Sequence, residues 1–338
     1  MDKWFQHTAQ NPDVVISTRI RLARNLSGLP FEGKITPIQQ KELNRIVREA
    51  LESRQAVHTA FRFLYMDAMS ALERQSLAEQ RLISQRFVEQ PANKMLAISS
   101  DDSLSVMVND EDHIRIQSFA GGMDLSGAYQ KCEELDDYFS TVFDYAFDDK
   151  LGYLTAFPTD LGTGLRASVL LHLPALERAQ VVPQLIKTVG RLGLTIRGAY
   201  GDGTRIAGAT YQLENQLTLG LSEQTAIANL ENVVAQVLSS ERSLRKELLK
   251  NNIDIIDEIC RSYGILKYAQ LLSSEEFYEK ISNVRFGVAE KVLEGVSIET
   301  LNTLLTRIGV ATLCAEANQS LSPRERDFHR AQLVRNAI

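Results

Sequence analysis

The spacing of apolar residues changes near residue 220, and this change limits the possible folds more than any other feature of the chain. Before it, short runs alternate between apolar and polar residues; in residues 166–173, every second residue from Ala167 onward is apolar, which is typical of a β-strand. After it, apolar residues recur every three or four positions, as in amphipathic helices. The sequence therefore predicts an α+β domain over residues 1–220, with an antiparallel sheet flanked by helices, and an all-helical domain over residues 221–338.

Local signals locate individual elements within this plan. Strand-like runs occupy residues 14–16, 95–99, 105–108, 113–119, 153–157 and 166–173. Residues that cap helices, because their side-chain oxygen accepts a hydrogen bond from the backbone, are Thr36, Ser222, Ser273, Ser297 and Ser322. Gly264 marks the expected end of one C-terminal helix. The apolar stripe that follows Ser222 fits packing within the helical domain or a dimer interface, and periodicity does not separate the two.

Charge and cysteine content argue against several classes of protein. The net charge of −6 gives no reason to expect nucleic acid or an anionic membrane as a direct partner. Cys132, Cys260 and Cys314 are far apart and form no metal-binding spacing, so we expect reduced thiols. We expect a cytoplasmic protein without a membrane partner, because the first residues lack a signal peptide and no apolar run is long enough to span a bilayer.

Five arginines lie at the ends of expected strands or in glycine-rich turns. They are Arg19, Arg21, Arg115, Arg166 and Arg197. Arginine suits phosphate because its planar guanidinium donates two parallel hydrogen bonds and keeps its charge. Two residues apart on a strand, Arg19 and Arg21 point the same way. Each arginine alone is more often a solvated surface residue, but as a set they indicate a phosphate site.

An acidic run precedes one of these arginines. Residues 109–113 contain three consecutive acids, and in an extended chain Glu111, His113 and Arg115 share a face. A carboxylate beside a phosphate-binding arginine suits a guanidinium substrate, which must lose a proton before its nitrogen attacks. An acidic turn and a divalent metal site are the alternatives, although the run lacks the spaced ligands of a dedicated metal cage.

Two glycine-rich segments complete the candidate chemistry. Residues 162–167 match the GxGxxA pattern of dinucleotide-binding proteins, but that pattern should open a helix, and here a strand-like run follows. Such a glycine-rich turn can also bring backbone N–H groups close to a phosphate. Residues 197–203 form a second glycine-rich loop, which suits either a lid over the substrate or a long hairpin turn.

Four segments together resemble the phosphagen kinase superfamily. They are residues 17–25, 109–115, 152–176 and 197–203, and they follow one another in the family's order. The arrangement is most similar to the bacterial protein arginine kinases of the McsB type. The segment 17–25 leaves no room for the small helical domain that precedes it in metabolic members, and residues 326–331 match that branch's RDxxRA signature.

The resemblance implies an ATP site, two catalytic acids and an allosteric pocket. The catalytic acids are Glu111 and Asp202. The ATP contacts are Ser17, Thr18, Arg19, Ile20, Arg21, Arg81, Arg115, Arg166, Ala167, Ser168, Val169, Leu170, Arg197, Gly198, Ala199, Tyr200, Gly201 and Asp202, with Mg²⁺ bound through ATP rather than by the protein. The allosteric pocket, for phosphoarginine, consists of Arg326, Asp327, Phe328, His329, Arg330 and Ala331. Without the resemblance, that last segment is typical of a salt-bridged surface helix.

Three departures from the family pattern bear on activity. Arg81 stands where the McsB type usually has histidine, and Phe157 and Asp160 replace a cysteine and an asparagine. Asp202 stands where arginine-specific members have glutamate. Its side chain is one methylene shorter, and a misplacement of about 1 Å can cost on the order of 100-fold in rate. These departures bear on efficiency more than on reaction type.

The resemblance also implies a biological role. The expected enzyme phosphorylates arginine side chains of proteins, which marks them for a Clp-type protease and relieves a heat-shock repressor. Its expected partners are protein substrates with exposed arginine, a small zinc-binding activator protein and a second copy of the chain. The alternatives are a metabolic kinase acting on free arginine, against which the short N-terminus argues, and a weakly catalytic adaptor that binds phosphoarginine.

Overall fold

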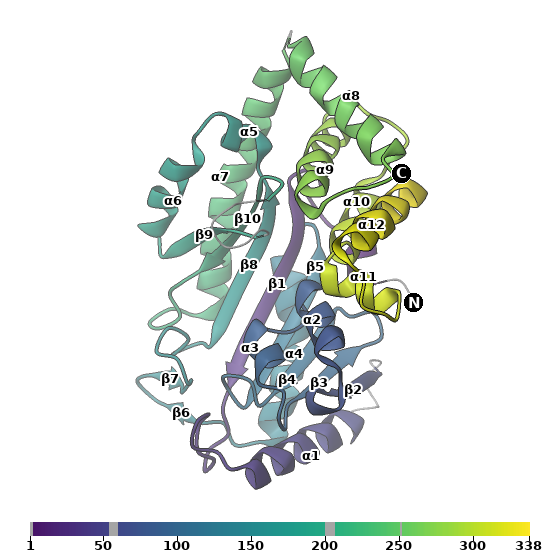
Figure 1. Ribbon diagram of the computed structural model, residues 1–338. Helices are drawn as coiled ribbons and strands as arrows, with labels where there is room; N and C mark the ends of the chain where they lie inside the picture. The colour runs from purple at the N-terminus through teal and green to yellow at the C-terminus, as the bar shows by residue number, and fades with distance from the viewer. Residues whose placement is uncertain (1–2, 54–59, 200–206, 251) are drawn as a thin grey trace.

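An antiparallel sheet of eight strands organises the structure, a computed structural model that describes residues 3–53, 60–199, 207–250 and 252–338 (Figure 1). Its strand order is β2-β3-β4-β5-β1-β8-β10-β9. The strands are β1 (Val15–Arg24), β2 (Phe61–Tyr65), β3 (Met95–Ser99), β4 (Leu104–Val108), β5 (Ile114–Gly121), β8 (Leu165–His172), β9 (Leu194–Gly198) and β10 (Thr210–Asn215). A separate hairpin pairs β6 (Phe147–Asp148) with β7 (Gly152–Tyr153).

Helices cover one whole face of this sheet. The long α1 (Pro37–Ser53), α4 (Leu125–Val142) and α7 (Glu223–Leu249) contribute to a core with the inward-facing strand residues, and the shorter α5 (Pro174–Arg178) and α6 (Val182–Gly190) adjoin it. Alternation along β1 explains the division of faces: Ile20 and Leu22 are buried in this core, whereas Arg19 and Arg21 face the other way.

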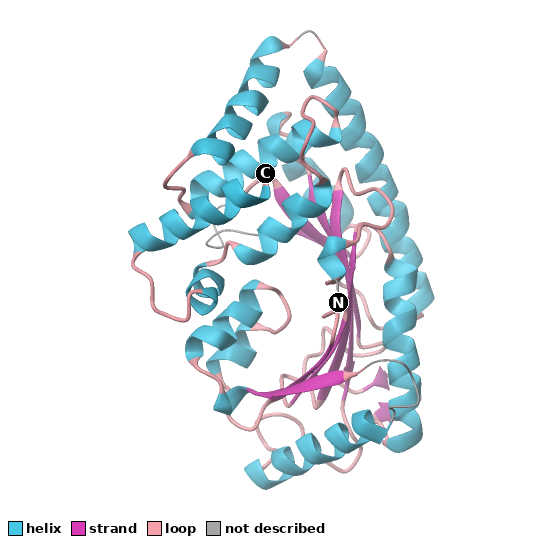
Figure 2. Cartoon of the chain, turned by 90° about the vertical axis from the view of Figure 1, so that its right-hand side faces the viewer, coloured by secondary structure: helices cyan, strands magenta, loops and turns pink. Residues whose placement is uncertain are grey.

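Within the described part of the chain, helices cover the opposite face at two places. The helices α2 (Ala71–Glu79) and α3 (Gln85–Glu89), with the short turns η1 (Trp4–Gln6) and η3 (Met66–Ala68), lie over β3 to β5. The C-terminal helices pack at the end of the sheet where Ile16 and Leu170 lie. These are α8 (Ile253–Tyr268), α9 (Ser274–Ala289), α10 (Ile298–Arg307) and α12 (Pro323–Ala337), whereas α11 (Val310–Glu316) packs against α2. Figure 2 shows the sheet nearly edge-on, with these two groups of helices on one side and the long helices on the other.

Direct contacts join the two groups. Glu79, at the end of α2, accepts hydrogen bonds from the backbone N–H groups of Ala311 (2.9 Å) and Thr312 (2.8 Å) at the start of α11. A carboxylate at a helix N-terminus is stabilising because it meets unpaired N–H groups and the positive end of the helix dipole. These hydrogen bonds therefore attach the C-terminal region to α2, which ends close to Arg81.

A buried ion pair fastens α7 to the end of β8, beside the C-terminal helices. Arg245 and Glu241 on α7 are fully buried and lie 2.7 Å apart. Glu241 accepts hydrogen bonds from the backbone of Ala175 and Leu176, and Arg245 donates to the carbonyl oxygen of His172 at the end of β8. The ring of His172 lies 2.8 Å from the hydroxyl of Ser282 on α9.

Most expected elements are confirmed, and two are wrong. The α+β class with a helical C-terminal region is confirmed, as are the capping residues expected at the five helix starts. The run at residues 153–157 is not a strand beyond Tyr153, because it leaves the two-residue β7 for a turn. Gly264 does not end a helix: α8 continues to Tyr268, because Leu266 is buried two residues later and its packing outweighs the weak helix propensity of glycine.

The helix α7, which follows residue 220, packs against the sheet rather than among the C-terminal helices. Its buried residues Leu230, Val234 and Val237 belong to the core that underlies the sheet. The division of the chain at residue 220 remains a prediction, while the packing places α7 against the sheet and leaves α8 to α12 as the all-helical C-terminal region. No described helix is both long and apolar enough to cross a membrane.

Candidate active site

The register of three neighbouring strands brings the predicted arginines to one face. In the pairing of β1 with β8, Arg21 lies opposite Arg166. In the pairing of β1 with β5, Ala23 lies opposite Arg115. Residues opposite each other in an antiparallel pair share a face, so these side chains point into the uncovered middle of the sheet. Gly164 begins this stretch at a φ of +63°, and a Cβ atom there would lie 2.6 Å from the carbonyl oxygen of Ala23, which only glycine avoids.

These residues line a cleft of about 550 Å³. It is polar and holds arginines from four strands together with three carboxylates. The lining residues are Arg21, Ala23, Glu111, Arg115, Phe157, Thr159, Asp160, Gly164, Arg166, Thr195, Arg197, Glu214 and Gln216. Five predicted residues that carry charge, namely Arg21, Glu111, Arg115, Arg166 and Arg197, thus meet in one place, although their sequence positions span 177 residues (197 − 21 + 1).

Carboxylates hold two of the cleft arginines at the rim. Arg115, buried on β5, donates to Asp110 at 2.8 Å and also to Glu111. These partners raise the pKa of Arg115, since they outweigh the effect of burial, which lowers it. Arg166 donates to Asp160 at 2.7 Å and to the carbonyl oxygen of Asn215 at 2.8 Å. Asp160, a departure from the family pattern, therefore orients a predicted phosphate-binding residue.

Glu214 on β10 is a site residue that the sequence did not reveal. It accepts a hydrogen bond from Arg197, and its Oε2 lies 3.9 Å from Nη2 of Arg21. Gln212, two residues earlier on the same strand, donates a hydrogen bond to the same Oε2 at 2.6 Å. The available signal was the alternation of residues 210–215, in which Tyr211 and Leu213 face the core while Gln212 and Glu214 lie on the opposite face of the sheet, with Glu214 in the cleft.

The cleft has the electrostatics of an anion site. Burial, and after it the like charge of Arg115, lowers the pKa of Arg21 to about 10. Burial, followed by repulsion from Arg21 and Arg81, lowers the pKa of Arg19 well below its usual value. Among the described residues, Nε of Arg21 is buried without a hydrogen-bond partner. Since a bound anion would relieve both the repulsion and the missing hydrogen bond, this surface favours a ligand rich in negative oxygen atoms.

A small hollow continues the cleft face along β1 and β8. It is lined by Trp4, Ser17, Arg19, Arg81, Phe119, Ser168, Leu170 and Gln212. Arg81 follows α2 with a φ of +66° and donates to the side chain of Gln212. Trp4 stacks on Phe119 with their ring centroids 5.4 Å apart. Five predicted ATP contacts (Ser17, Arg19, Arg81, Ser168 and Leu170) therefore gather beside a pair of aromatic rings.

Other predicted ATP contacts point away from this face or cannot be placed. The side chains of Ile20, Ala167 and Val169 belong to the core beneath the sheet, and Thr18 is buried and donates to the carbonyl oxygen of Gly122. Gly198 ends β9 at the surface, and Ala199 packs beside the core of the C-terminal helices. Tyr200, Gly201 and Asp202 lie outside the described residues, so the prediction of a second catalytic acid at Asp202 concerns a position without structural description.

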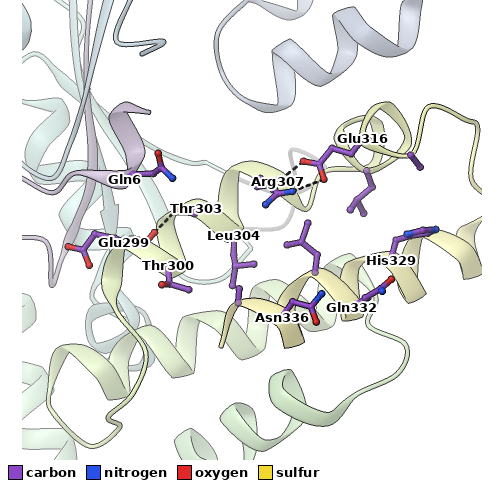
Figure 3. A pocket seen from close by; sticks show the side chains of 14 residues that line it. Gln6, Glu299, Thr300, Thr303, Leu304, Arg307, Glu316, His329, Gln332 and Asn336 are labelled. Atoms are coloured by element: carbon purple, nitrogen blue, oxygen red, sulfur yellow. Dashed lines mark hydrogen bonds and ion pairs between the residues drawn. The ribbon is translucent and has the colours of Figure 1, made fainter. Parts of the chain in front are cut away.

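The predicted phosphoarginine pocket lies on α12. Arg330 is buried there and donates to the carbonyl oxygen of Leu272 (2.7 Å) and to Asp327 (2.8 Å). Arg326 is partly exposed, Phe328 is exposed, and Ala331 is buried in the helical core. His329 points elsewhere, into a groove of about 700 Å³ between α10, α11 and α12, beside the ion pair of Arg307 with Glu316 (Figure 3). The pocket therefore stays a prediction.

The fold and the cleft define an enzyme of the guanidino phosphotransferase class, with an arginine-rich phosphate site and a carboxylate beside it. Comparison with known proteins agrees. Residues 42–244 match the family model of the ATP:guanido phosphotransferase C-terminal catalytic domain, and residues 252–338 match that of the protein-arginine kinase McsB C-terminal domain. The chain belongs to the ATP:guanido phosphotransferase family, in the branch of the protein-arginine kinases.

Full-length relatives agree with this assignment, and solved structures share the fold. The chain is 38% identical to a protein-arginine kinase of Pelotomaculum thermopropionicum, over 98% of this chain and 94% of that protein. It is 41% identical to one of Symbiobacterium thermophilum, over 98% and 95%. Among solved structures, a duplicated taurocyamine kinase of Schistosoma mansoni has a TM-score of 0.63 at 25% identity, covering 73% of this chain and 37% of that one. Lombricine kinase, with a TM-score of 0.60 at 21% identity and 73% of each chain covered, supports the fold.

Proposed function

We propose that this cleft transfers the γ-phosphoryl group of Mg²⁺-ATP to the guanidinium groups of arginine side chains in proteins. The observation that carries the proposal is the convergence of Arg21, Arg115, Arg166 and Arg197 with Glu111 in one cleft. The arginines supply fixed positive charge where phosphate charge develops, and phosphoryl transfer depends mainly on such positioning and electrostatics.

The nucleotide lies along the cleft face. Its phosphates contact the arginines of the cleft, and its base lies toward Arg81, one of the predicted ATP contacts. An arginine side chain can stack on the flat face of a purine. Mg²⁺ arrives with the nucleotide and neutralises phosphate charge; within the described part of the chain no three acids, histidines or cysteines form a metal cluster. The protein's contribution is to hold the phosphates in line with the acceptor.

Glu111 holds the acceptor. In the structure its carboxylate binds the guanidinium of Arg115 from the rim of the cleft. A substrate arginine offers the same chemical group, so Glu111 can bind it in the same manner while Asp110 keeps Arg115 in place from its other side. Glu111 then orients the attacking nitrogen and accepts its proton as the N–P bond forms, while the bond from the γ-phosphorus to the β–γ bridging oxygen breaks and ADP leaves. Asp202 is the predicted second acid in this step.

The acceptor is an arginine of a protein rather than free arginine. Support comes from the names of the relatives, which are protein-arginine kinases aligned over nearly their whole lengths, and from the match of residues 252–338 to a domain specific to that branch.

The remaining proposals concern the cellular context. The enzyme acts in the cytoplasm, as a homodimer, together with a small zinc-binding activator. Its product would mark proteins for a Clp-type protease and relieve a heat-shock repressor, with phosphoarginine binding at residues 326–331 as a feedback signal.

The test is transfer of labelled γ-phosphate from Mg²⁺-ATP to a loosely folded protein in one tube and to free arginine in another. The proposal predicts acid-labile label on the protein and none on free arginine. Label on free arginine alone would support a metabolic kinase. If neither acceptor is labelled with or without an activator while phosphoarginine peptides bind, the chain is an adaptor and the proposal fails.

Glu111→Gln tests the role of the acid. The substitution keeps the size of the side chain but removes the base, so transfer should fall by about 100-fold or more. Binding of ADP should change little, because the nucleotide contacts the arginines. Transfer at the wild-type rate would refute the assignment of Glu111.

A further inference from the structure

Glu214 occupies an unusual position within the arginine cleft. Across the sheet it lies opposite Ser168 on β8, which in turn lies opposite Arg19 on β1. Because serine is short, it leaves the carboxylate of Glu214 open toward the arginines of β1. On its other side, Glu214 binds Arg197 of β9. One carboxylate thus interacts with arginines on both sides.

Its surroundings differ from those of the other cleft carboxylates. The side chain of Glu214 is only 5% exposed, compared with 24% for Glu111 and 13% for Asp160. Glu111 and Asp160 each pair with a single cleft arginine at the rim. Glu214 instead lies within the positive surface and interacts with two arginines.

Glu214 carries its negative charge at neutral pH. Burial by itself raises the pKa of the carboxyl group, but the charges of Arg21 and Arg197 outweigh it, so the pKa lies below its usual value. Gln212 adds a hydrogen bond to the ionised form at 2.6 Å. A phosphate that approaches these arginines therefore meets a fixed like charge, and it must also replace Glu214 as their partner.

We propose that Glu214 is a resident anion that binds Arg197 and lies beside the phosphate-binding end of Arg21 in the free enzyme, and thereby lowers the enzyme's affinity for nucleotide. The inference rests on the proposed function and adds to it a residue that sets nucleotide affinity. Nucleotide binding is an exchange, in which Arg197 leaves Glu214 for phosphate oxygens and Arg21 gains phosphate oxygens as partners. Arg197 is suited to this exchange because its side chain is 61% exposed and lies on an edge strand.

A purely structural role predicts the opposite sign. If Glu214 served mainly to position Arg197 for phosphate, removing its charge would release Arg197 and weaken nucleotide binding. If Glu214 competes with phosphate, removing the charge strengthens binding. The direction of the change in affinity therefore separates the two roles, and the dependence on salt adds a second criterion, because only the electrostatic role is screened by ions.

The experiment is calorimetric titration of Mg²⁺-ADP into the full-length chain at low and high salt. Glu214→Gln should lower the dissociation constant about 10-fold at low salt and less at high salt. Glu214→Ala is measured alongside, because it removes the charge without adding an amide that needs partners. Glu214→Asp retains the charge and should show no tightening.

The matched control is Glu177→Gln. Glu177 accepts a hydrogen bond from the hydroxyl of Tyr211, which lies on the opposite face of the same strand. This variant removes an equal charge outside the cleft and should leave ADP affinity unchanged. Unchanged or weaker binding by both Glu214→Gln and Glu214→Ala would overturn the inference while the proposed function stands. A wild-type chain that binds no ADP would refute both.

Discussion

Two sets of arginines in this molecule have different kinds of partner. In the cleft, Arg21 and Arg197 share one carboxylate. In the C-terminal half, buried arginines donate mainly to backbone carbonyl oxygens: Arg245 to His172 and Asp13, Arg285 to Pro12, and Arg330 to Leu272 and Ile308. Carbonyl oxygens belong to the folded backbone, so those arginines stay where they are, whereas a side-chain carboxylate can be exchanged for a phosphate.

The comparison teaches how to separate ligand-binding arginines from structural ones. Burial does not separate them, because Arg115 in the cleft is about as buried as Arg285. The partner does: the cleft collects like charges whose mutual repulsion a phosphate relieves, while the C-terminal arginines close hydrogen bonds that would otherwise leave buried carbonyl groups unpaired. Arg166 is intermediate, since it binds both Asp160 and the backbone of Asn215.

The largest effect is expected in the cleft. Arg21→Gln removes one charge that stabilises the transferring phosphoryl group, so the rate of transfer to protein should fall by about 100-fold to 1,000-fold. Folding should change little, because Arg21 contributes only a 3.9 Å ion pair and suffers repulsion from its neighbours. Arg45→Gln, which breaks ion pairs on the exposed face of α1, is the control and should keep full activity. Full activity in Arg21→Gln would contradict the role assigned to Arg21 in phosphoryl transfer.

The second effect concerns stability. Arg245→Met removes one partner of a fully buried ion pair and leaves Glu241 charged, which should lower the free energy of unfolding by about 3 kcal/mol. Urea denaturation measures this. Arg261→Met, which breaks an exposed pair with Asp257, should change the stability by less than about 0.5 kcal/mol. Equal effects of the two substitutions would contradict a structural role for Arg245.

The third effect depends on pH. Burial, and then the charges of Arg245 and Arg285, lowers the pKa of His172 well below its usual value. The unfolded chain therefore binds a proton near pH 6.5 that the folded protein does not, and stability should fall as the pH drops below that value, by up to about 1.4 kcal/mol per pH unit. Denaturation at pH 7 and pH 5.5 measures it. His172→Gln should remove this component, and an unchanged pH dependence would show that another group causes it.

The smallest effect tests the predicted phosphoarginine pocket. Arg326 is partly exposed on α12, so Arg326→Ala should change the stability by less than about 0.5 kcal/mol. If the pocket prediction is correct, the same variant should bind phosphoarginine peptide several-fold more weakly. Arg330→Ala is a poor probe of binding, because it also removes hydrogen bonds to Leu272 and Ile308. Unchanged peptide binding in Arg326→Ala would refute a role for this residue.

The sequence predicted those parts of the fold and the site that local patterns encode. Alternation located most strands and showed that Arg19 and Arg21 share a face, and capping residues located the helix starts. The Gly-rich turn before Arg166 was correctly predicted to lead into a strand rather than a helix. These predictions succeed because each depends only on residues that lie close together in the sequence.

The sequence did not predict how distant strands pair or how the helices pack against one another. The alternation of residues 210–215 could show that Glu214 faces away from the core, but only the pairing of β10 with β8 and β9 places it among the arginines of the cleft. The end of α8 was misplaced at Gly264, because the packing of Leu266 decides it rather than glycine's own preference. Both failures arise from contacts between residues that are distant in sequence.

One set of thermal unfolding curves, with and without saturating Mg²⁺-ADP, tests the division between the two sets of arginines most directly. A ligand that binds only the folded state raises the melting temperature. The wild-type chain should show this rise; Arg21→Gln should lose the rise but keep the ligand-free melting temperature; Arg245→Met should melt about 5 °C lower without ligand yet keep the rise. If instead Arg21→Gln melts lower and keeps the rise, or Arg245→Met loses the rise at an unchanged melting temperature, the roles assigned to the two sets are wrong.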